Sequence, residues 1–205
     1  QGDTILERRR YMKENLDHFR KALMWEPRGH ADMYGCIIPP PVTPEADFGV
    51  LFLHNEGYST MCGHGIIAVT KVVLECGMLP MKGNTIPVNI DSPAGLIRAT
   101  AKISNNKVES VSFINVPSFV QALDQSIEVE GIGKVNYDIA YGGAFYAYVN
   151  ADEIGIGMSP NDHDELIEKG MAIKRVVMKS FTFKHPFEAD LNFLYGTIFT
   201  GAPLT

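Results

Sequence analysis

The sequence predicts an α+β fold, in which helices and mainly antiparallel strands occupy separate stretches of the chain. Apolar residues recur at helical spacing near the start of the chain, and residues 66–76 form a long apolar run after a glycine-rich loop. Strand-like runs separated by turn residues fill most of residues 86–149. Both halves show the order strands, helix, strands, as a duplicated fold would. We therefore expect two domains, residues 1–118 and 119–205.

The first expected helix begins at a capping box formed by Thr4 and Glu7. Pro27 ends it, because the residue before a proline avoids the helical region. Four apolar residues lie on one face of this helix: Met12, Leu16, Phe19 and Leu23.

Two further helices are expected. Residues 66–76 are apolar nearly all the way round, which is typical of a buried helix, and Gly77 is a natural stop. Residues 159–162 should cap a helix that runs to about residue 178. The strands are expected at 32–38, 48–53, 86–90, 95–102, 108–116, 127–129, 133–135, 137–141, 144–149, 181–183 and 193–199.

The composition limits the classes of partner. The chain has 205 residues, 45% of them hydrophobic, and a formal net charge of -6. A negative charge disfavours non-specific binding of nucleic acid. No apolar run is long enough to span a bilayer, and the polar start does not look like a signal peptide. We therefore expect neither nucleic acid nor a membrane as a partner.

The cysteines indicate a reduced, cytoplasmic protein. There are three, Cys36, Cys62 and Cys76, which is too few and an odd number for a disulfide framework. No CxxC or HxH pattern occurs, so no metal site is expected. We expect Cys36 and Cys76 to be inert core residues.

The motif MCGHG at residues 61–65 is the strongest chemical signal. Cys62 lies at the expected N-terminus of a helix, where backbone N–H groups and the helix dipole favour a thiolate. The flanking glycines let successive N–H groups point into one concavity, and the same groups could hold a substrate carboxylate. The alternative is that Cys62 is a small buried hydrophobic residue, which is the commoner role of a lone cysteine.

Several segments, in order along the chain, resemble the proline racemase family. They are residues 26–35 (EPRGHADMYG), 61–65 (MCGHG), 91–96 (DSPAGL), 138–146 (DIAYGGAFY), 185–186 (HP) and 193–197 (FLYGT). The resemblance covers nearly the whole chain, which makes it more specific than any single motif. Residues 51–59 and 193–199 look closest to the trans-3-hydroxy-L-proline dehydratase subgroup.

The resemblance implies a diaminopimelate epimerase-like fold: two similar β-rich, barrel-like domains, each wrapped round a central helix, with the second incomplete here. It also implies that no cofactor and no metal is used, that a proline or hydroxyproline imino acid is the substrate, and that a homodimer is possible. The implied catalytic residue is Cys62, and the implied substrate-binding residues are Gly63, His64, Gly65 and His185.

The implied reaction begins when the Cys62 thiolate removes the α-proton of the substrate. Dehydration of trans-3-hydroxy-L-proline is the preferred outcome, and proline racemisation or 4-hydroxyproline 2-epimerisation is the alternative. The residue that separates these outcomes, a second-site cysteine or threonine, would follow Thr205, and the usual opening segment of the family is not found in this sequence. A fragment that only binds a ligand or a partner chain is therefore the alternative of another class.

Overall fold

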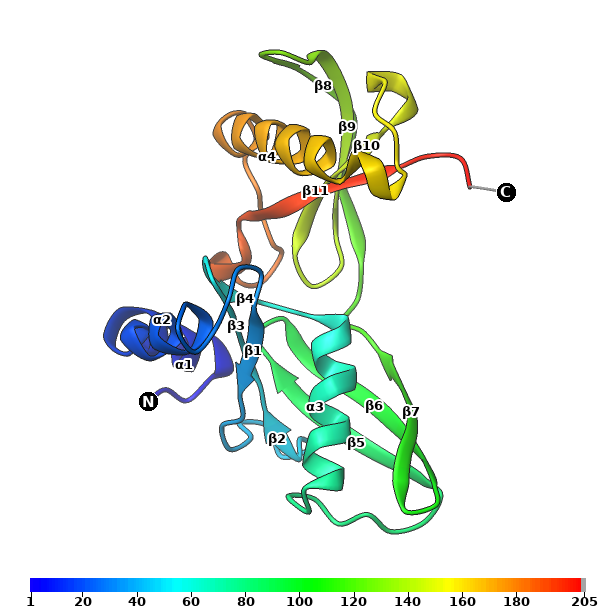
Figure 1. Cartoon of the computed structure of the whole chain (residues 1–205). Coiled ribbons are helices and arrows are strands. Elements are labelled where there is room, and N and C mark those ends of the chain that lie inside the picture. Colours follow the sequence, from blue (N-terminus) through cyan, green and yellow to red (C-terminus); the bar gives the residue numbers. More distant parts are fainter. Residues whose placement is uncertain (204–205) are drawn as a thin grey trace. The chain divides into compact units, whose positions relative to one another are not determined.

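The computed structural model describes residues 1–203, and the chain forms two compact units, Gln1–Val116 and Pro117–Thr205. Figure 1 labels the elements of each unit. The first unit contains α1 Ile5–Asn15, α2 Asp17–Met24, β1 Tyr34–Ile37, β2 Phe48–Gly49, β3 Leu51–His54, β4 Gly57–Ser59, α3 Gly63–Glu75, β5 Thr85–Ser92, β6 Gly95–Ser104 and β7 Lys107–Ile114. The second contains β8 Phe119–Val129, β9 Gly133–Tyr141, β10 Phe145–Asn150, three short 3₁₀ helices, α4 His163–Ser180 and β11 Leu194–Thr200. The predicted α+β class is confirmed.

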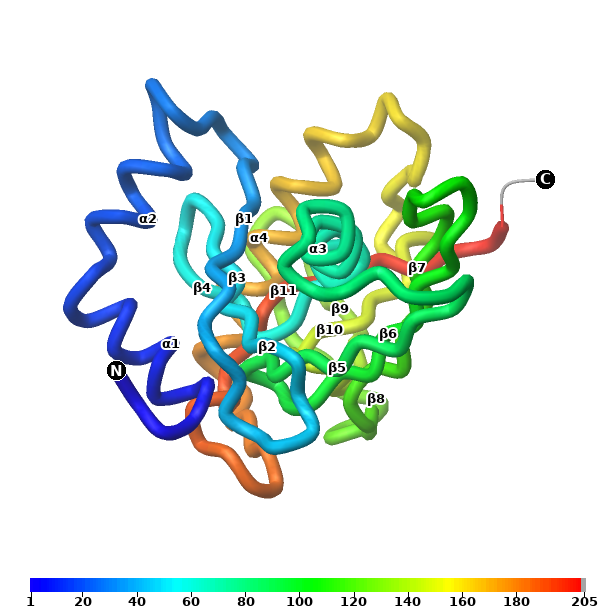
Figure 2. Tube along the Cα trace, turned by 90° about the horizontal axis from the view of Figure 1, so that it is seen from below, coloured from blue at the N-terminus to red at the C-terminus, as the bar shows by residue number. Residues whose placement is uncertain are grey.

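In the first unit, α3 packs between two sheets. One sheet has the antiparallel order β1-β3-β4, and the other has the order β2-β5-β6-β7. Figure 2 looks nearly along α3, with β1 and β3 on one side and β5, β6 and β7 on the other. Ile66, Val69 and Val73 of α3 lie in the same buried cluster as Phe52 of β3 and Ile97 of β6. The packing of α3 against both sheets thus fixes the position of its N-terminus relative to them.

The predicted burial of α3 on all sides is wrong. Ile67 and Val72 are 42% and 48% exposed, whereas Ile66 and Val73 are almost fully buried. The helix therefore has one buried face and one open face among the described residues. Its predicted end is confirmed, because Gly77 follows the last turn with a positive φ of 73°.

The single helix predicted at the start of the chain is two helices. The capping box of Thr4 and Glu7 is present, but the chain leaves the helical region at Leu16 (φ −127°, ψ 15°). After this break, α2 turns a different face inward: Arg20 and Met24 are buried, while Phe19 is 53% exposed. The buried face of α2 contains an arginine where an apolar residue was expected. The pattern of apolar residues therefore predicted the wrong face of this helix.

The predicted strand 48–53 is divided at Val50. Its first part, β2, pairs with β5 in parallel, and its second part, β3, pairs with β1 and β4. The segment therefore crosses from one sheet to the other. The predicted meander of β5, β6 and β7 is confirmed.

The second unit is a four-stranded sheet of order β11-β10-β9-β8 with α4 packed on it. Three predicted strands between 127 and 141 are two long strands that form a hairpin, and β8 begins earlier, at Phe119. The predicted helix after residue 162 and the strand near 193–199 are confirmed as α4 and β11.

The predicted strand 181–183 is wrong. Residues 181–183 have no ladder partner, although Phe183 is buried. The Gln121 side chain donates to the Thr182 carbonyl at 3.0 Å and accepts from the Lys184 N–H at 3.4 Å. A side-chain amide thus replaces the strand partner that the apolar pattern predicted.

The division into epimerase-like domains 1–118 and 119–205 stays a prediction. Among the described residues, no helix is long and apolar enough to cross a membrane.

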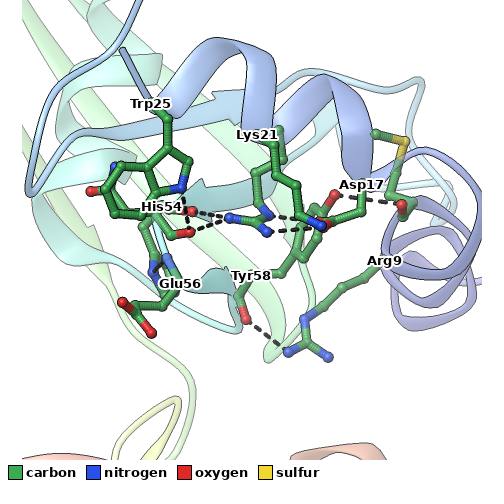
Figure 3. Close-up of polar contacts among 10 residues, drawn as sticks. Arg9, Asp17, Lys21, Trp25, His54, Glu56 and Tyr58 are labelled. Atoms are coloured by element: carbon green, nitrogen blue, oxygen red, sulfur yellow. Dashed lines mark hydrogen bonds and ion pairs between the residues drawn. The ribbon is translucent and has the colours of Figure 1, made fainter.

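A buried arginine ties α2 to the β3–β4 hairpin, and Figure 3 labels Asp17, Trp25 and His54 of this group of contacts. The Arg20 guanidinium donates to the Asp17 carboxylate at 2.6 and 2.9 Å, and to the backbone carbonyls of His54, at 2.9 Å, and Asn55. The Trp25 indole N–H also donates to the Asn55 carbonyl, at 3.2 Å. Because both carbonyls lie at the hairpin turn, one side chain holds the turn against the helix.

Replacing Arg20 by leucine should destabilise the fold. The change removes the closer of the two cations beside Asp17 and the guanidinium donor of two turn carbonyls, of which Asn55 keeps only the Trp25 N–H, so we expect a loss of about 2–3 kcal/mol in the free energy of unfolding. Urea denaturation measures it. Lys21→Ala is the matched control, because Lys21 is 66% exposed and lies 3.4 Å from the same carboxylate; it should cost about 0.5 kcal/mol or less. Equal losses in the two variants would contradict this role of Arg20.

The same ion pair should produce a defined acid dependence. The hydrogen bond from Arg20 lowers the pKa of Asp17 to about 2 from its ordinary 3.8. A carboxylate with a lowered pKa in the folded state stabilises the fold above its unfolded value, and that contribution is lost as the pH falls through the folded value. Wild type should therefore exceed Asp17→Asn by about 2 kcal/mol at pH 6, and the difference should shrink toward pH 2. A difference independent of pH would rule out the ion pair as its source.

Candidate active site

Cys62 caps the N-terminus of α3. Its backbone is extended (φ −148°, ψ 109°), and its carbonyl accepts the first helical hydrogen bond, from the Ile66 N–H at 2.9 Å. Its sulfur accepts the N–H of Gly65 at 3.3 Å, in the position that a serine or aspartate oxygen takes at ordinary helix caps. The side chain is 8% exposed. The predicted helix start at this motif is confirmed.

Two backbone donors stand free beside the sulfur. Within residues 1–203, the N–H groups of Gly63 and His64 have no hydrogen-bond partner. They belong to the first turn of a helix, where unpaired N–H groups and the dipole attract anions. The Gly65 N–H is already engaged by the sulfur. The site therefore has two free backbone N–H donors next to the Cys62 sulfur.

The His64 imidazole lies against the Cys62 sulfur. Its Nε2 and Nδ1 are 3.4 and 3.6 Å from Sγ. These near-equal distances place the sulfur beside the edge between the two nitrogens or over the ring, in line with neither N–H. The contact brings the imidazole close to the sulfur, but neither ring nitrogen makes a well-aligned hydrogen bond to it.

Gly65 has no room for a side chain. A Cβ at this position would lie 2.8 Å from Phe52 Cε1 and 3.1 Å from the Cys62 Sγ. At Gly63, a Cβ would lie 3.1 Å from Phe113 Cζ. Close packing at the helix start therefore excludes a side chain at Gly65 and leaves only a tight fit for one at Gly63, although neither glycine has a positive φ.

Tyr34 belongs to the same group of side chains, although no local pattern in the sequence predicts its place beside Cys62 and His64. Its ring lies 5.6 Å from the His64 ring and 5.9 Å from the His54 ring, centroid to centroid. Its hydroxyl is hydrogen-bonded to the Ser59 hydroxyl. Contacts across strands are nonlocal, so only the pairing of β1 with β3 reveals them.

His185 lies in the second unit, after α4. Its Nδ1 accepts the N–H groups of Glu188, at 3.1 Å, and Phe187, at 3.4 Å. Burial against the rings of Phe119 and Tyr141 lowers its pKa below the ordinary 6.5, partly opposed by the Glu188 charge. An Nδ1 that accepts hydrogen bonds is unprotonated, so at neutral pH the ring is neutral with its proton on Nε2.

The expectation that Cys36 and Cys76 lie in the core is wrong. Both are exposed, and Cys62 is the buried thiol. Cys36 is on β1, the first strand of the three-stranded sheet, and Cys76 caps the far end of α3. Over the part of the chain that the structure describes, no three His, Cys, Asp or Glu side chains gather as a metal site.

A cysteine-capped helix held between two sheets, with free N–H groups at its start, defines a class of α+β protein with a thiol at the N-terminus of a helix. The sequence model of the proline racemase family matches residues 1–205, and the chain belongs to that family.

Curated relatives carry more specific names. The chain is 52% identical over 198 residues to a trans-3-hydroxy-L-proline dehydratase of Colwellia psychrerythraea (97% of this chain, 56% of that protein). It is 45% identical over 203 residues to the trans-3-hydroxy-L-proline dehydratase of Homo sapiens (97% and 57%). The chain thus spans less than two thirds of the length of these relatives.

A solved structure agrees with the fold. A hydroxyproline epimerase from Agrobacterium vitis with bound trans-4-hydroxy-L-proline superposes with a TM-score of 0.92 and 29% identity, covering 97% of this chain and 59% of that one. The predicted family and its fold are therefore confirmed.

Adding a methyl group at Gly65 should disrupt the helix start. Gly65→Ala must displace the Phe52 ring or the Cys62 sulfur, so we expect the free energy of unfolding to fall by about 1–3 kcal/mol. Chemical denaturation measures the loss. Gly57→Ala is the control, since a Cβ there would have no heavy atom within 4 Å. A Gly65→Ala protein as stable as the Gly57→Ala protein would show that the site relaxes freely.

Proposed function

We propose that this chain carries the proton-abstracting site of a proline racemase family enzyme that dehydrates trans-3-hydroxy-L-proline. The observation that carries the proposal is the Cys62 sulfur at the free N-terminus of α3, in a chain that belongs to this family. The dehydratase chemistry is supported by the names of relatives at 45% and 52% identity.

The proposed first step is proton transfer to sulfur. The Cys62 thiolate takes the proton from the substrate α-carbon, and the electron pair of that C–H bond stays on the carbon. The pair then forms a double bond to the neighbouring ring carbon as the C–O bond of the 3-hydroxyl breaks. The departing hydroxide needs one proton to leave as water, so an acid must stand on that side of the ring. No cofactor and no metal takes part in this proposal.

The substrate carboxylate is proposed to bind at the start of α3. The free N–H groups of Gly63 and His64 are its donors, and Gly65 contributes by leaving space and by holding the sulfur through its own N–H. Donors fixed at the place where negative charge develops stabilise the carbanion more than they stabilise the substrate. The start of α3 would thus both bind the substrate and assist proton loss.

His185 is proposed as a second substrate-binding residue. Its ring is held by two backbone N–H groups at Nδ1, which leaves the Nε2–H as a donor for a polar group of the imino acid. A neutral ring adds no charge that would compete for the carboxylate. The possible homodimer and the cytoplasmic location stay predictions.

One observation favours a second candidate function. The Agrobacterium vitis structure with a TM-score of 0.92 is named a hydroxyproline epimerase and holds trans-4-hydroxy-L-proline. Racemisation or epimerisation would share the Cys62 step and would then return a proton to the opposite face of the ring. A chain that binds the imino acid without turnover is the remaining alternative.

Proton exchange in D₂O tests the proposal. The protein is incubated with trans-3-hydroxy-L-proline, trans-4-hydroxy-L-proline and L-proline, and NMR follows α-deuteration, inversion and loss of the 3-hydroxyl. We expect loss of the 3-hydroxyl only, and a fall of at least about 100-fold in Cys62→Ser, because a hydroxyl is a far weaker base than a thiolate. Cys76→Ser at the other end of α3 is the control and should retain activity.

Each other outcome separates the alternatives. Inversion of proline or 4-hydroxyproline would show that the reaction is racemisation or epimerisation and not the proposed dehydration. Binding of the imino acid without any α-deuteration would leave the binding alternative. Undiminished exchange in Cys62→Ser would remove Cys62 from the mechanism.

A further inference from the structure

The His64 ring has few contacts of its own. The side chain is exposed, and its described contacts are the Cys62 sulfur and the Tyr34 ring, which is tilted by 57° against it. An exposed imidazole on a single Cα–Cβ bond samples several rotamers unless a neighbour restricts it. The orientation of His64 beside the sulfur therefore depends on what fixes Tyr34.

Tyr34 is fixed from three sides. It lies directly opposite His54 in the antiparallel β1–β3 pair, and the two rings are stacked with an interplanar angle of 14°. Its ring also contacts Phe52 at a centroid distance of 6.1 Å. Its hydroxyl is hydrogen-bonded to that of Ser59, which is 1% exposed. A cross-strand aromatic pair and a hydrogen bond to the buried Ser59 hydroxyl together hold the ring in one place.

We propose that Tyr34 is a positioning residue that holds the His64 imidazole beside the Cys62 sulfur. The proposal rests on Cys62 being the base of the proposed function. The His64 imidazole lies 3.4 Å from the sulfur through Nε2 and presents a polar edge to it. Tyr34 thereby acts on the reactivity of Cys62 through His64, without touching the substrate's reacting atoms.

The hydroxyl of Tyr34 and its ring contribute separately to the position of His64, and substitutions can distinguish the two contributions. Tyr34→Leu removes the surface against which His64 packs. Tyr34→Phe keeps that surface and removes only the hydroxyl that binds Ser59. Ser59→Ala removes the same hydrogen bond from the other side, so it should reproduce the effect of Tyr34→Phe.

The test measures the rate at which iodoacetamide alkylates Cys62 between pH 5 and 10, in the whole chain, with mass spectrometry of the Cys62 peptide to exclude Cys36 and Cys76. Tyr34→Leu should lower the rate at pH 7 by about fivefold and move the midpoint of the profile to higher pH. Tyr34→Phe and Ser59→Ala should each give about a twofold decrease, and the double variant should add nothing further. Tyr11→Leu, a half-buried tyrosine on α1, is the control and should match wild type.

Two readouts keep this inference separate from the proposed function. A purely structural role would lower the thermal midpoint in proportion to the rate change without moving the pH profile, and this result would overturn the inference. If Tyr34→Leu does not fold, Tyr34→Phe and Ser59→Ala decide, and wild-type profiles in both would overturn it. Undiminished α-deuteration in Cys62→Ser would instead refute the proposed function, whatever the alkylation profiles show.

Discussion

The capping of α3 by a sulfur atom is the constraint on which the rest of the first unit depends. A cap normally places an oxygen over the first turn, and here the Gly65 N–H binds Cys62 Sγ instead. The two remaining donors of that turn have no partner among the described residues, and the packing of Gly65 against Phe52 leaves no space for a bulkier residue. Because the buried face of the helix is embedded between two sheets, the cap cannot shift without disturbing the core.

A series of contacts links α2 to this N-terminal cap of α3. Arg20 on α2 holds the turn of the β3–β4 hairpin through the His54 and Asn55 carbonyls. The same hairpin carries Ser59, which binds Tyr34, and Tyr34 contacts His64. Residues that never reach the sulfur therefore contribute to the geometry around it. This arrangement is typical of precise sites, in which supporting contacts outnumber those that touch the ligand.

Local signals in the sequence predicted the parts of this site that depend on local structure. The glycines after Cys62 and the apolar run beyond them were sufficient for the helix start, and the capping box at Thr4 was also correct. The contact of Tyr34 with His64 escaped prediction because it arises from strand pairing between distant segments. The face of α2 was misassigned because a buried arginine, satisfied by Asp17 and two carbonyls, took an apolar position.

The parallel pairing of β10 with β11 sets an order of assembly for the second unit. β9 and β10 are joined by a short turn and can pair as soon as both exist, whereas Tyr146 of β10 meets Gly196 of β11 only after α4 has crossed the sheet. Closing a loop of this length carries an entropic cost that a hairpin avoids. We therefore expect the amide protons that are hydrogen-bonded between β10 and β11 to become protected from hydrogen exchange later during refolding than those of the β8–β9–β10 meander.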